Sequence, residues 1–323
     1  MCQIRFCHRL MTKVALTDRY KGLIMPLSIL DFFRDLTKLE FRILSVIEVL
    51  MARYEFVPIE EVASRLKYSE KRIKLALDKL RRKKMVLMVQ KHYLGVALTF
   101  IGYDALALKA LVEKGLLAQI GPEIGAGKES DIRLAIDDNE FEFIIKFHRL
   151  GKLDFRSTRR ARAFVAEKRH ISPLYESRLS AEREFKALYD LYNAGVSVPK
   201  PISQNRHILA MCIVKGQDLY RIKKNEFVNE DEVVTLFENI INELQSAVNL
   251  GYIHGDLSEY NIRLNEDDYP VLFDWPQYIE TKSEQSKEIL TRDIQNILNY
   301  FQKKFQMKSK MHISEILENF DSF

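Results

Sequence analysis

The feature that most constrains this chain is a set of three polar side chains placed around a short apolar run. Asp256 and Asn261 lie in one loop, and the apolar run 271–273 then ends in Asp274. Mg²⁺ is usually held by one or two protein oxygens of this kind together with phosphate groups. The spacing therefore predicts a fold that brings the three side chains to one metal–phosphate site. His254, at the start of the loop, is expected to be a hydrogen-bonded structural residue rather than a base.

This segment and an upstream glycine-bearing loop together predict a protein-kinase-like site that binds ATP. The segment fits H-x-D-x-x-x-x-N, the catalytic loop of protein kinases, with Gly255 in place of arginine. In the upstream loop, Gly125 and Gly127 fit the first two glycines of G-x-G-x-x-G, and Ser130 stands at the third. Missing side chains let backbone N–H groups approach the phosphates. Lys128 and the Ser130 hydroxyl are expected to add contacts, although a plain hairpin turn would carry similar residues.

A lysine and a carboxylate between these two loops complete the predicted site. Lys146 ends an apolar strand, as in the kinase V-A-I-K motif, and is expected to pair with the α- and β-phosphates. Such a lysine needs a carboxylate from a neighbouring helix to hold it. Glu184 is favoured over Glu182 because the apolar residues Leu188 and Leu191 share its helix face.

The apolar strand 208–214 predicts the hinge between two lobes. Backbone groups of Cys212 and Ile213 are expected to hydrogen-bond adenine, and Met211 is expected to line the nucleotide pocket. The alternative for these side chains is an ordinary core strand, and both interpretations stay open.

The N-terminal part predicts a winged helix-turn-helix that contacts nucleic acid. Helical periodicity over 27–53, 57–66 and 70–83 is followed by an alternating stretch over 86–99. In such modules the third helix usually enters a nucleic-acid groove. The alternative is a solvated helix face. Between residues 71 and 91 a single acid, Asp78, accompanies nine basic residues: Lys71, Arg72, Lys74, Lys79, Arg81, Arg82, Lys83, Lys84 and Lys91.

These patterns predict an α+β chain of 323 residues, in which a winged helix-turn-helix precedes a two-lobed kinase-like domain. The predicted parts are an N-terminal extension (1–25), the winged helix (26–98), a linker helix (99–118), an N-lobe (119–214) with a basic insertion (149–170), and a C-lobe (215–323). No apolar run reaches the length of a membrane span, and the three cysteines lack zinc-site spacing. We therefore expect a cytoplasmic protein without a membrane partner.

The chain resembles the RIO family of atypical kinases, in the subfamily that carries an N-terminal winged helix. The resemblance covers about residues 27–310. It rests on Gly125-Ala126-Gly127-Lys128-Glu129-Ser130, Ile145-Lys146-Phe147-His148, Ser180-Ala181-Glu182-Arg183-Glu184-Phe185, the segment His254 to Asn261, and Asp274-Trp275-Pro276-Gln277. Trp275 departs from the usual phenylalanine, and Cys212 stands where an acidic hinge residue is common. No A-P-E motif follows Asp274, so a peptide substrate site is doubtful.

The resemblance implies an ATP- and Mg²⁺-dependent serine kinase or ATPase acting on the precursor of the small ribosomal subunit. Lys146 would pair with the phosphates and Glu184 would hold it, and Ser130 would contact phosphate. Asp256 would orient the attacking hydroxyl group or accept its proton, and Asn261 and Asp274 would bind Mg²⁺, with a phosphoaspartate at Asp274 as an intermediate. The winged helix and the basic insertion would contact rRNA. One alternative is a small-molecule phosphotransferase of the aminoglycoside or choline kinase type, which shares the H-G-D loop. Another is a non-enzymatic DNA-binding regulator that uses only the winged helix.

Overall fold

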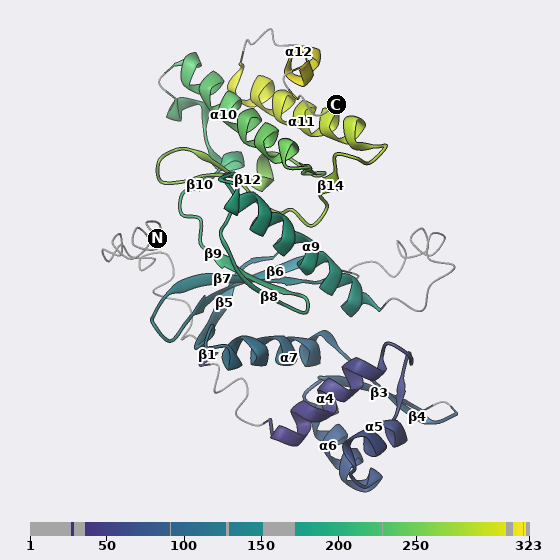
Figure 1. The fold of residues 1–323 in the computed structure, drawn as a ribbon. Helices are drawn as coiled ribbons and strands as arrows, with labels where there is room; N and C mark the ends of the chain where they lie inside the picture. The colour runs from purple at the N-terminus through teal and green to yellow at the C-terminus, as the bar shows by residue number, and fades with distance from the viewer. Residues whose placement is uncertain are drawn as a thin grey trace.

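The N-terminal module is a winged helix built from three helices and a small sheet. The computed structural model describes residues 27–28, 36–90, 92–126, 129–150, 172–227, 229–307, 313–318 and 320 (Figure 1). The module's helices are α4 (Lys38–Leu50), α5 (Ile59–Leu66) and α6 (Glu70–Arg82). Its antiparallel sheet has the order β2-β4-β3, formed by Val57–Pro58, Leu94–Leu98 and Val86–Gln90.

Local capping chemistry sets where the first of these helices begins. Thr37 and Glu40 form a capping box, in which the Glu40 amide donates to Thr37 Oγ1 at 3.2 Å and the Thr37 amide donates to Glu40 Oε2 at 2.7 Å. The helix expected over 27–53 therefore begins only at Lys38. Leu27–Ser28 instead form β1, which pairs with Gln119 and Ile120 of the next domain. Leu27 and Ser28, which the predicted bounds assign to the winged helix, therefore extend the N-lobe sheet.

The predicted linker helix is a core element shared by two domains. It is α7 (Phe100–Glu113), capped where the Gly102 amide donates to Thr99 Oγ1. Tyr103, Ala105 and Leu106 pack in the winged-helix core, whereas Ala107, Leu108 and Leu111 pack under the N-lobe sheet. A helix that is apolar on two faces is buried on both, so α7 fixes the winged helix to the kinase-like domain.

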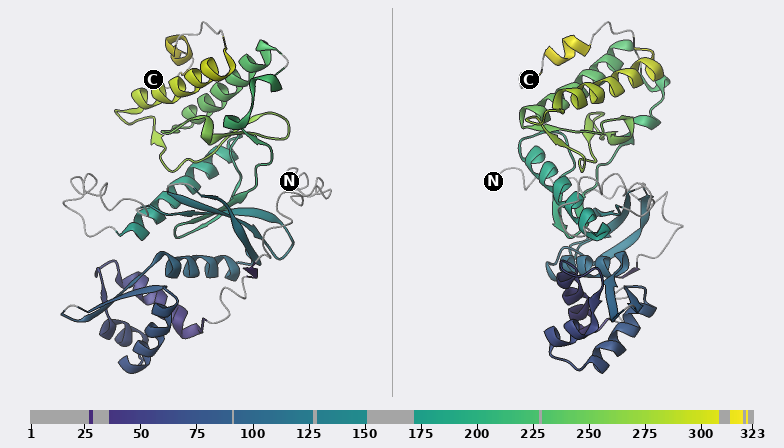
Figure 2. Two further views of the ribbon diagram at one scale, coloured as in Figure 1. Left: turned by 180° about the vertical axis from the view of Figure 1, so that it is seen from behind. Right: turned by 90° about the vertical axis from the view of Figure 1, so that its right-hand side faces the viewer.

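The N-lobe is a six-stranded antiparallel sheet with the order β1-β5-β6-β7-β9-β8. The strands other than β1 are β5 (Gln119–Ala126), β6 (Ser130–Ile136), β7 (Glu142–His148), β8 (Pro201–Asn205) and β9 (Ile208–Cys212). The helix α9 (Pro173–Asn193) lies on the opposite face of this sheet from α7 (Figure 1, Figure 2).

Period-two alternation along β7 decides which side chains reach which helix. Phe143, Ile145 and Phe147 are buried in the core that the N-lobe sheet forms with α7. Lys146 and His148 project from the other face, where α9 supplies their partners. A strand therefore delivers a charged side chain to the interior on one face while its apolar residues build a core on the other.

The C-lobe is mainly helical and holds the largest apolar core. Its helices are α10 (Glu230–Asn249), α11 (Ser286–Phe305) and α12 (Ile313–Glu318). Short strands form two small sheets, β10-β12-β13 (Gln217–Asp218, Ile262–Leu264, Pro270–Leu272) and β11-β14 (Tyr252–Ile253, Ile279–Glu280). The short 3-10 helices are η1 (Leu219–Arg221), η2 (Lys224–Glu226) and η3 (Glu259–Asn261).

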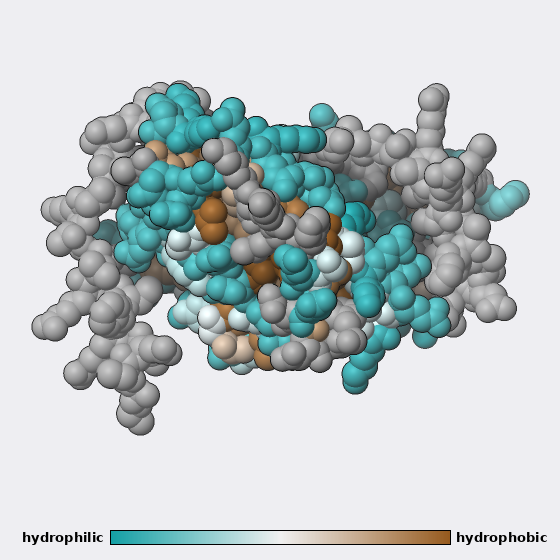
Figure 3. Space-filling model, turned by 90° about the horizontal axis from the view of Figure 1, so that it is seen from above, coloured by the Kyte–Doolittle hydropathy of each residue, from teal (hydrophilic) through white to brown (hydrophobic). Residues whose placement is uncertain are grey.

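Among the described residues visible in Figure 3, polar side chains predominate, and a smaller apolar area lies near the middle of the view. In the part of the chain that the structure describes, no helix combines the length and the apolar character needed to cross a membrane.

Candidate active site

The centre of the site is a buried lysine between two carboxylates from different lobes. Lys146 Nζ donates to both oxygens of Glu184 at 2.8 Å and to Asp274 Oδ1 at 2.5 Å. Glu184 is only 1% exposed, whereas the Asp274 side chain is 41% exposed. The choice of Glu184 over Glu182 agrees with this geometry, since Glu182 pairs instead with Arg178 on the surface of α9. One cation thus links the N-lobe sheet, α9 and the C-lobe.

Electrostatics keep this cluster ionised. Burial alone would raise the pKa of Glu184, but the charge of Lys146 and the contact with His148 outweigh it and lower the pKa to about 2. Burial likewise opposes the charged form of Lys146, yet Glu184 and Asp274 raise its pKa above the ordinary value. His148 Nε2 lies 2.9 Å from Glu184 Oε2, and His148 Nδ1 lies 2.9 Å from Ser180 Oγ. The carboxylate of Glu184 is therefore held in place from two sides.

The loop between β11 and η3 is shaped by a histidine and a glycine. The fully buried His254 donates from Nε2 to the Phe273 carbonyl at 3.1 Å, and its Nδ1 accepts the Asp256 amide at 3.3 Å. This pattern requires the neutral tautomer, in keeping with burial that lowers its pKa. Gly255 has φ +83°, and a Cβ there would lie 2.5 Å from the Gln277 carbonyl oxygen. Arginine, the usual kinase residue, does not fit this backbone.

Hydrogen bonds to main-chain carbonyl groups connect the remaining predicted residues to this centre. Asn261 Nδ2 donates to the Asp256 carbonyl at 2.8 Å, and the Phe273 amide donates to the Asn261 carbonyl at 3.0 Å. Asp274 follows with φ +72°, an uncommon conformation for a residue other than glycine. Asp256 itself is exposed. The structure thus brings Lys146, Glu184, Asn261 and Asp274 together and leaves the Asp256 carboxylate open to solvent beside them.

Trp275 shows why the departure from phenylalanine is accommodated. Its indole is fully buried, donates from Nε1 to the Leu272 carbonyl at 3.2 Å, and lies 4.5 Å from the His254 ring, centroid to centroid. Burying a tryptophan is favourable when its N–H finds a partner. The larger ring packs under the loop rather than toward the open face of the site.

Sequence reasoning missed Asp293, which organises the same loop. This carboxylate in α11 is fully buried and accepts the Gly255 amide at 2.7 Å and the Leu257 amide at 3.4 Å. Burial raises its pKa. The sequence contains a signal for this residue, because Asp293 is a charged residue on the otherwise apolar helix face that includes Leu290 and Ile294. Its role could be recognised only once the loop was seen to pack against this helix.

The glycine-bearing strand offers open space where phosphates are expected. A Cβ placed on Gly125 would meet nothing nearer than 3.8 Å, so nothing in the fold itself requires glycine there. A register irregularity separates Glu123 from Gly125 in the pairing of β5 with β6. Ser130 begins β6 opposite His148. Gly127 and Lys128 lie outside the residues that the structure describes.

The hinge prediction needs one correction. The Cys212 amide donates to the Lys200 carbonyl at 2.9 Å, so this N–H is used within the protein and does not face adenine. Met211 is 4% exposed and packs in the core that α9 shares with the C-lobe. Ile213 follows the end of β9 and is partly exposed. An adenine contact at this hinge is therefore left to Ile213 and to backbone carbonyl groups.

The basic insertion also needs a correction at its first residue. The predicted insertion begins at Arg149, but this residue is 8% exposed and forms ion pairs with Asp104 and Asp131. It is a structural residue of the N-lobe rather than a surface contact. Residues 151–171, which carry the rest of the insertion, lie outside the described part of the chain.

The predicted nucleic-acid face is solvent-exposed along α6. Lys71, Lys74 and Lys79 are exposed, whereas the apolar face of the helix, including Ile73 and Leu77, is fully buried. Ser69 precedes the helix in extended conformation, but its side chain makes no capping hydrogen bond. Arg72 stacks on Tyr68, with its guanidinium carbon 4.5 Å from the ring centroid. Lys91 lies outside the described residues.

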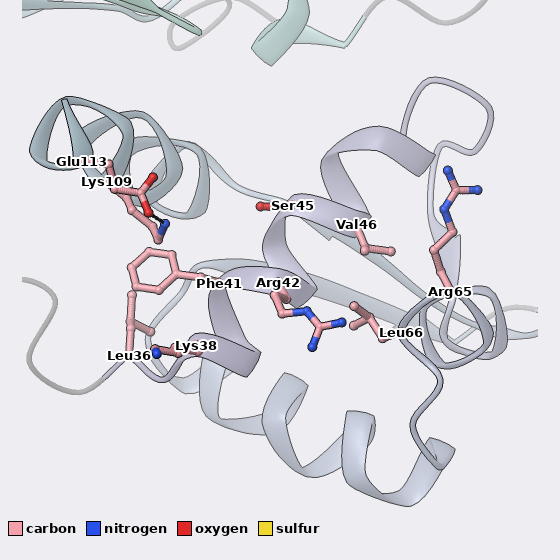
Figure 4. Close-up of a pocket in the computed structure, with 10 residues that line it drawn as sticks. All are labelled: Leu36, Lys38, Phe41, Arg42, Ser45, Val46, Arg65, Leu66, Lys109 and Glu113. Carbon is pink, nitrogen blue, oxygen red and sulfur yellow. Dashed lines mark hydrogen bonds and ion pairs between the residues drawn. The ribbon is translucent and has the colours of Figure 1, made fainter.

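A groove of about 760 Å³ lies between α4, the end of α5 and α7 (Figure 4). Its lining mixes apolar side chains with cations, among them Phe41, Arg42 and Lys109, and Lys109 pairs with Glu113. None of the predicted catalytic residues lines it. We place the chemistry at Lys146 and not in this groove, because only there do buried, oppositely charged groups converge from both lobes.

The donors present fit Mg²⁺ better than a metal with an all-protein ligand set. Within the described residues, no group of three or more His, Cys, Asp or Glu side chains is arranged to hold a metal ion. Asp274 and Asn261 would supply one carboxylate and one amide oxygen. Mg²⁺ typically takes one or two protein oxygens and completes its shell with phosphates and water.

Comparison with known proteins agrees with the geometry. A family model described as RIO domain matches residues 131–316, and one described as Rio2, N-terminal matches residues 33–114. The RIO-type serine/threonine-protein kinase Rio2 of Methanocaldococcus jannaschii is 42% identical over 78% of this chain and 92% of that protein. The serine/threonine-protein kinase rio2 of Schizosaccharomyces pombe is 32% identical over 85% of this chain and 79% of that protein. The Rio2 kinase-ADP/Mg²⁺-phosphoaspartate complex from Chaetomium thermophilum has a TM-score of 0.77 at 27% identity, covering 91% of this chain and 88% of that one.

Proposed function

Because this chain belongs to the RIO family of serine/threonine protein kinases, in the Rio2 type with an N-terminal winged helix, we propose that it is an ATP-dependent kinase and ATPase of small-subunit maturation. The observation that supports this most is the contact of Lys146 Nζ with both Glu184 and Asp274. It joins the two lobes around the position where a metal-bound triphosphate would lie.

Each residue has a role that follows from its surroundings. Bound Mg²⁺–ATP supplies the transferable phosphoryl group and charge neutralisation. Lys146, kept charged by Glu184, binds phosphate oxygens, and Asn261 and Asp274 hold the metal. The exposed Asp256 carboxylate orients an attacking hydroxyl group or water and accepts its proton.

A phosphoaspartate step is part of the proposal. An oxygen of Asp274 attacks the γ-phosphorus, the bond to the bridging oxygen breaks, and ADP leaves with the bridging oxygen. Water then hydrolyses the acyl phosphate, which returns the carboxylate and releases phosphate. The named phosphoaspartate complex of the Chaetomium thermophilum relative supports this assignment, and carboxylates act as nucleophiles in other phosphoryl transfers.

This step predicts a covalent label on the protein. Incubation with γ-labelled ATP and Mg²⁺ should give a label that hydroxylamine removes, and Asp274→Asn should abolish it. A label that persists in Asp274→Asn would exclude Asp274 as the acceptor. If the unmodified chain fails to bind ATP at all, the kinase assignment itself is wrong.

The partner we propose is the rRNA of the small-subunit precursor in the cytoplasm. The exposed cations of α6 support phosphate contact, and a small-molecule kinase has no need for such a face. Replacing Lys71, Lys74 and Lys79 with alanine is expected to weaken rRNA binding about tenfold near 0.1 M salt, and to reduce the salt slope by about two units, since each phosphate contact contributes about 0.7–0.9.

The matched control for this measurement replaces three exposed lysines of the C-lobe, Lys282, Lys287 and Lys303. It removes the same charge from another surface. Affinity measured by filter binding at several salt concentrations should change little in the control. An equal loss in both triple variants would mean that the net charge of the chain, and not α6, sets the binding.

A further inference from the structure

We call the segment from Gly125 to Asp131 the phosphate loop. The side chain of Arg149 lies between this loop and α7. Its Nη1 and Nη2 donate to the two oxygens of Asp104 in α7 at 2.6 and 2.9 Å, and its Nε donates to Asp131 Oδ2 at 2.9 Å. The guanidinium carbon also lies 5.1 and 5.0 Å from the ring centroids of Phe100 and Phe147. One planar cation is thus held between two acids and two aromatic rings.

The main chain of Arg149 holds the same loop from the other side. Its amide donates to the Glu129 carbonyl at 2.7 Å. Glu129 and Asp131 are the two neighbours of Ser130, the residue expected to contact phosphate. Arg149 therefore fixes the chain immediately before Ser130 through its backbone and immediately after it through its side chain.

The charged groups that Arg149 contacts are largely buried, so each depends on its partner. The side chains of Arg149, Asp104 and Asp131 are 10%, 15% and 13% exposed. His207 Nε2, fully buried, lies 2.7 Å from Asp104 Oδ1, which fixes that carboxylate further. Removing one member of a buried charge pair leaves its partner unpaired in a poorly solvated place. A lysine would restore the charge but not the forked donor geometry.

We propose that Arg149 is a positioning residue that sets the phosphate loop, and that it couples the docking of α7 to triphosphate binding. The inference rests on the proposed nucleotide site. A change at α7 that shifts Asp104 would act on Ser130 through a single side chain. Partners bound to the winged helix would then alter the affinity for ATP without touching the nucleotide.

The test compares ATP with adenosine, which occupies the hinge but lacks phosphates. In Arg149→Met, the Kd for ATP is expected to rise about tenfold, because Asp131 loses the charged donor that holds the chain next to Ser130. The Kd for adenosine should stay within about twofold, as one phosphate-loop contact changes and the hinge does not. Asp104→Asn should also raise the Kd for ATP, although Asp104 belongs to α7 and not to the phosphate loop. Arg149→Lys should give only partial recovery.

Arg206→Met is the matched control. Arg206 also joins the N-lobe to the winged-helix module, with Nε and Nη2 donating to the two oxygens of Glu48 in α4 at 2.8 and 2.7 Å. It makes no contact with the phosphate loop among its described hydrogen bonds. Arg206→Met should leave the ratio of the affinities for ATP and adenosine unchanged.

Equal losses for ATP and adenosine in Arg149→Met, or an equal change of the ratio in Arg206→Met, would overturn the inference. An unmodified chain that binds ATP no better than adenosine would instead contradict the proposed function. The two failures are therefore distinguishable in one titration series.

Discussion

Replacing Asp256 with asparagine is expected to lower the rate of phosphoryl transfer about 10³-fold, in the range that a positioned general base contributes. The Asp256 side chain is exposed, and Asn261 contacts only its carbonyl, so the loop should keep its shape. ATP affinity should change less than twofold, because Lys146 and Asp274 hold the nucleotide. Single-turnover hydrolysis together with nucleotide titration separates the two quantities.

Glu259→Gln provides the control for this measurement. Glu259 is a carboxylate of the same loop segment, at the start of η3, and removing its charge changes the local potential without removing the proposed base. Its rate should remain close to that of the unmodified chain. If Asp256→Asn retains more than about a tenth of the original rate, Asp256 does not act as a general base.

Replacing Lys146 with methionine is expected to destabilise the fold by about 3–5 kcal/mol, the usual consequence of leaving a buried charge without its partner. Glu184 is 1% exposed and would lose its main counter-charge, although His148 remains near it. Asp274 is more exposed and should be solvated instead. The free energy of unfolding in urea measures the loss, provided that the transition stays two-state.

The double variant Lys146→Met with Glu184→Gln removes the unpaired charge and keeps a hydrogen-bonding side chain next to His148. We expect it to recover most of the lost stability. A double variant that is less stable than the single one would show that the charge of Glu184 is not the cause. Catalysis should be lost in both variants, since the phosphate-binding cation is absent from each.

The pH dependence of stability gives a second signature of the same pair. The pKa of Glu184 is lowered to about 2 in the folded chain, from 4.5. A lowered pKa means that the stabilising contribution is present above 4.5 and is lost as the pH falls toward 2. In Lys146→Met the carboxyl group should bind its proton more readily, so stability should fall less between pH 5 and pH 2.

The sequence by itself predicted a metal–phosphate site and located most local elements. Lys146, Glu184, Asn261 and Asp274 are the residue types that metal–phosphate chemistry would need. The structure places Lys146 against Glu184 and Asp274, and hydrogen-bonds Asn261 to the residue before Asp274. Periodicity located the third helix of the winged module and its wing, since side-chain spacing follows directly from helix and strand geometry. The same motifs carried the resemblance to the RIO family, and the family models and relatives show that the chain belongs to it.

Only the tertiary structure decided which distant segments share hydrogen bonds. Asp293 reaches Gly255, Arg149 joins Asp104 to Asp131, and the Cys212 amide donates to Lys200 instead of facing a nucleotide. Burial of α7 on two faces likewise converted a predicted linker into shared core. Local spacing determines the direction of a side chain relative to its own helix or strand. Its partner depends on how those elements pack, and packing is a property of the whole chain.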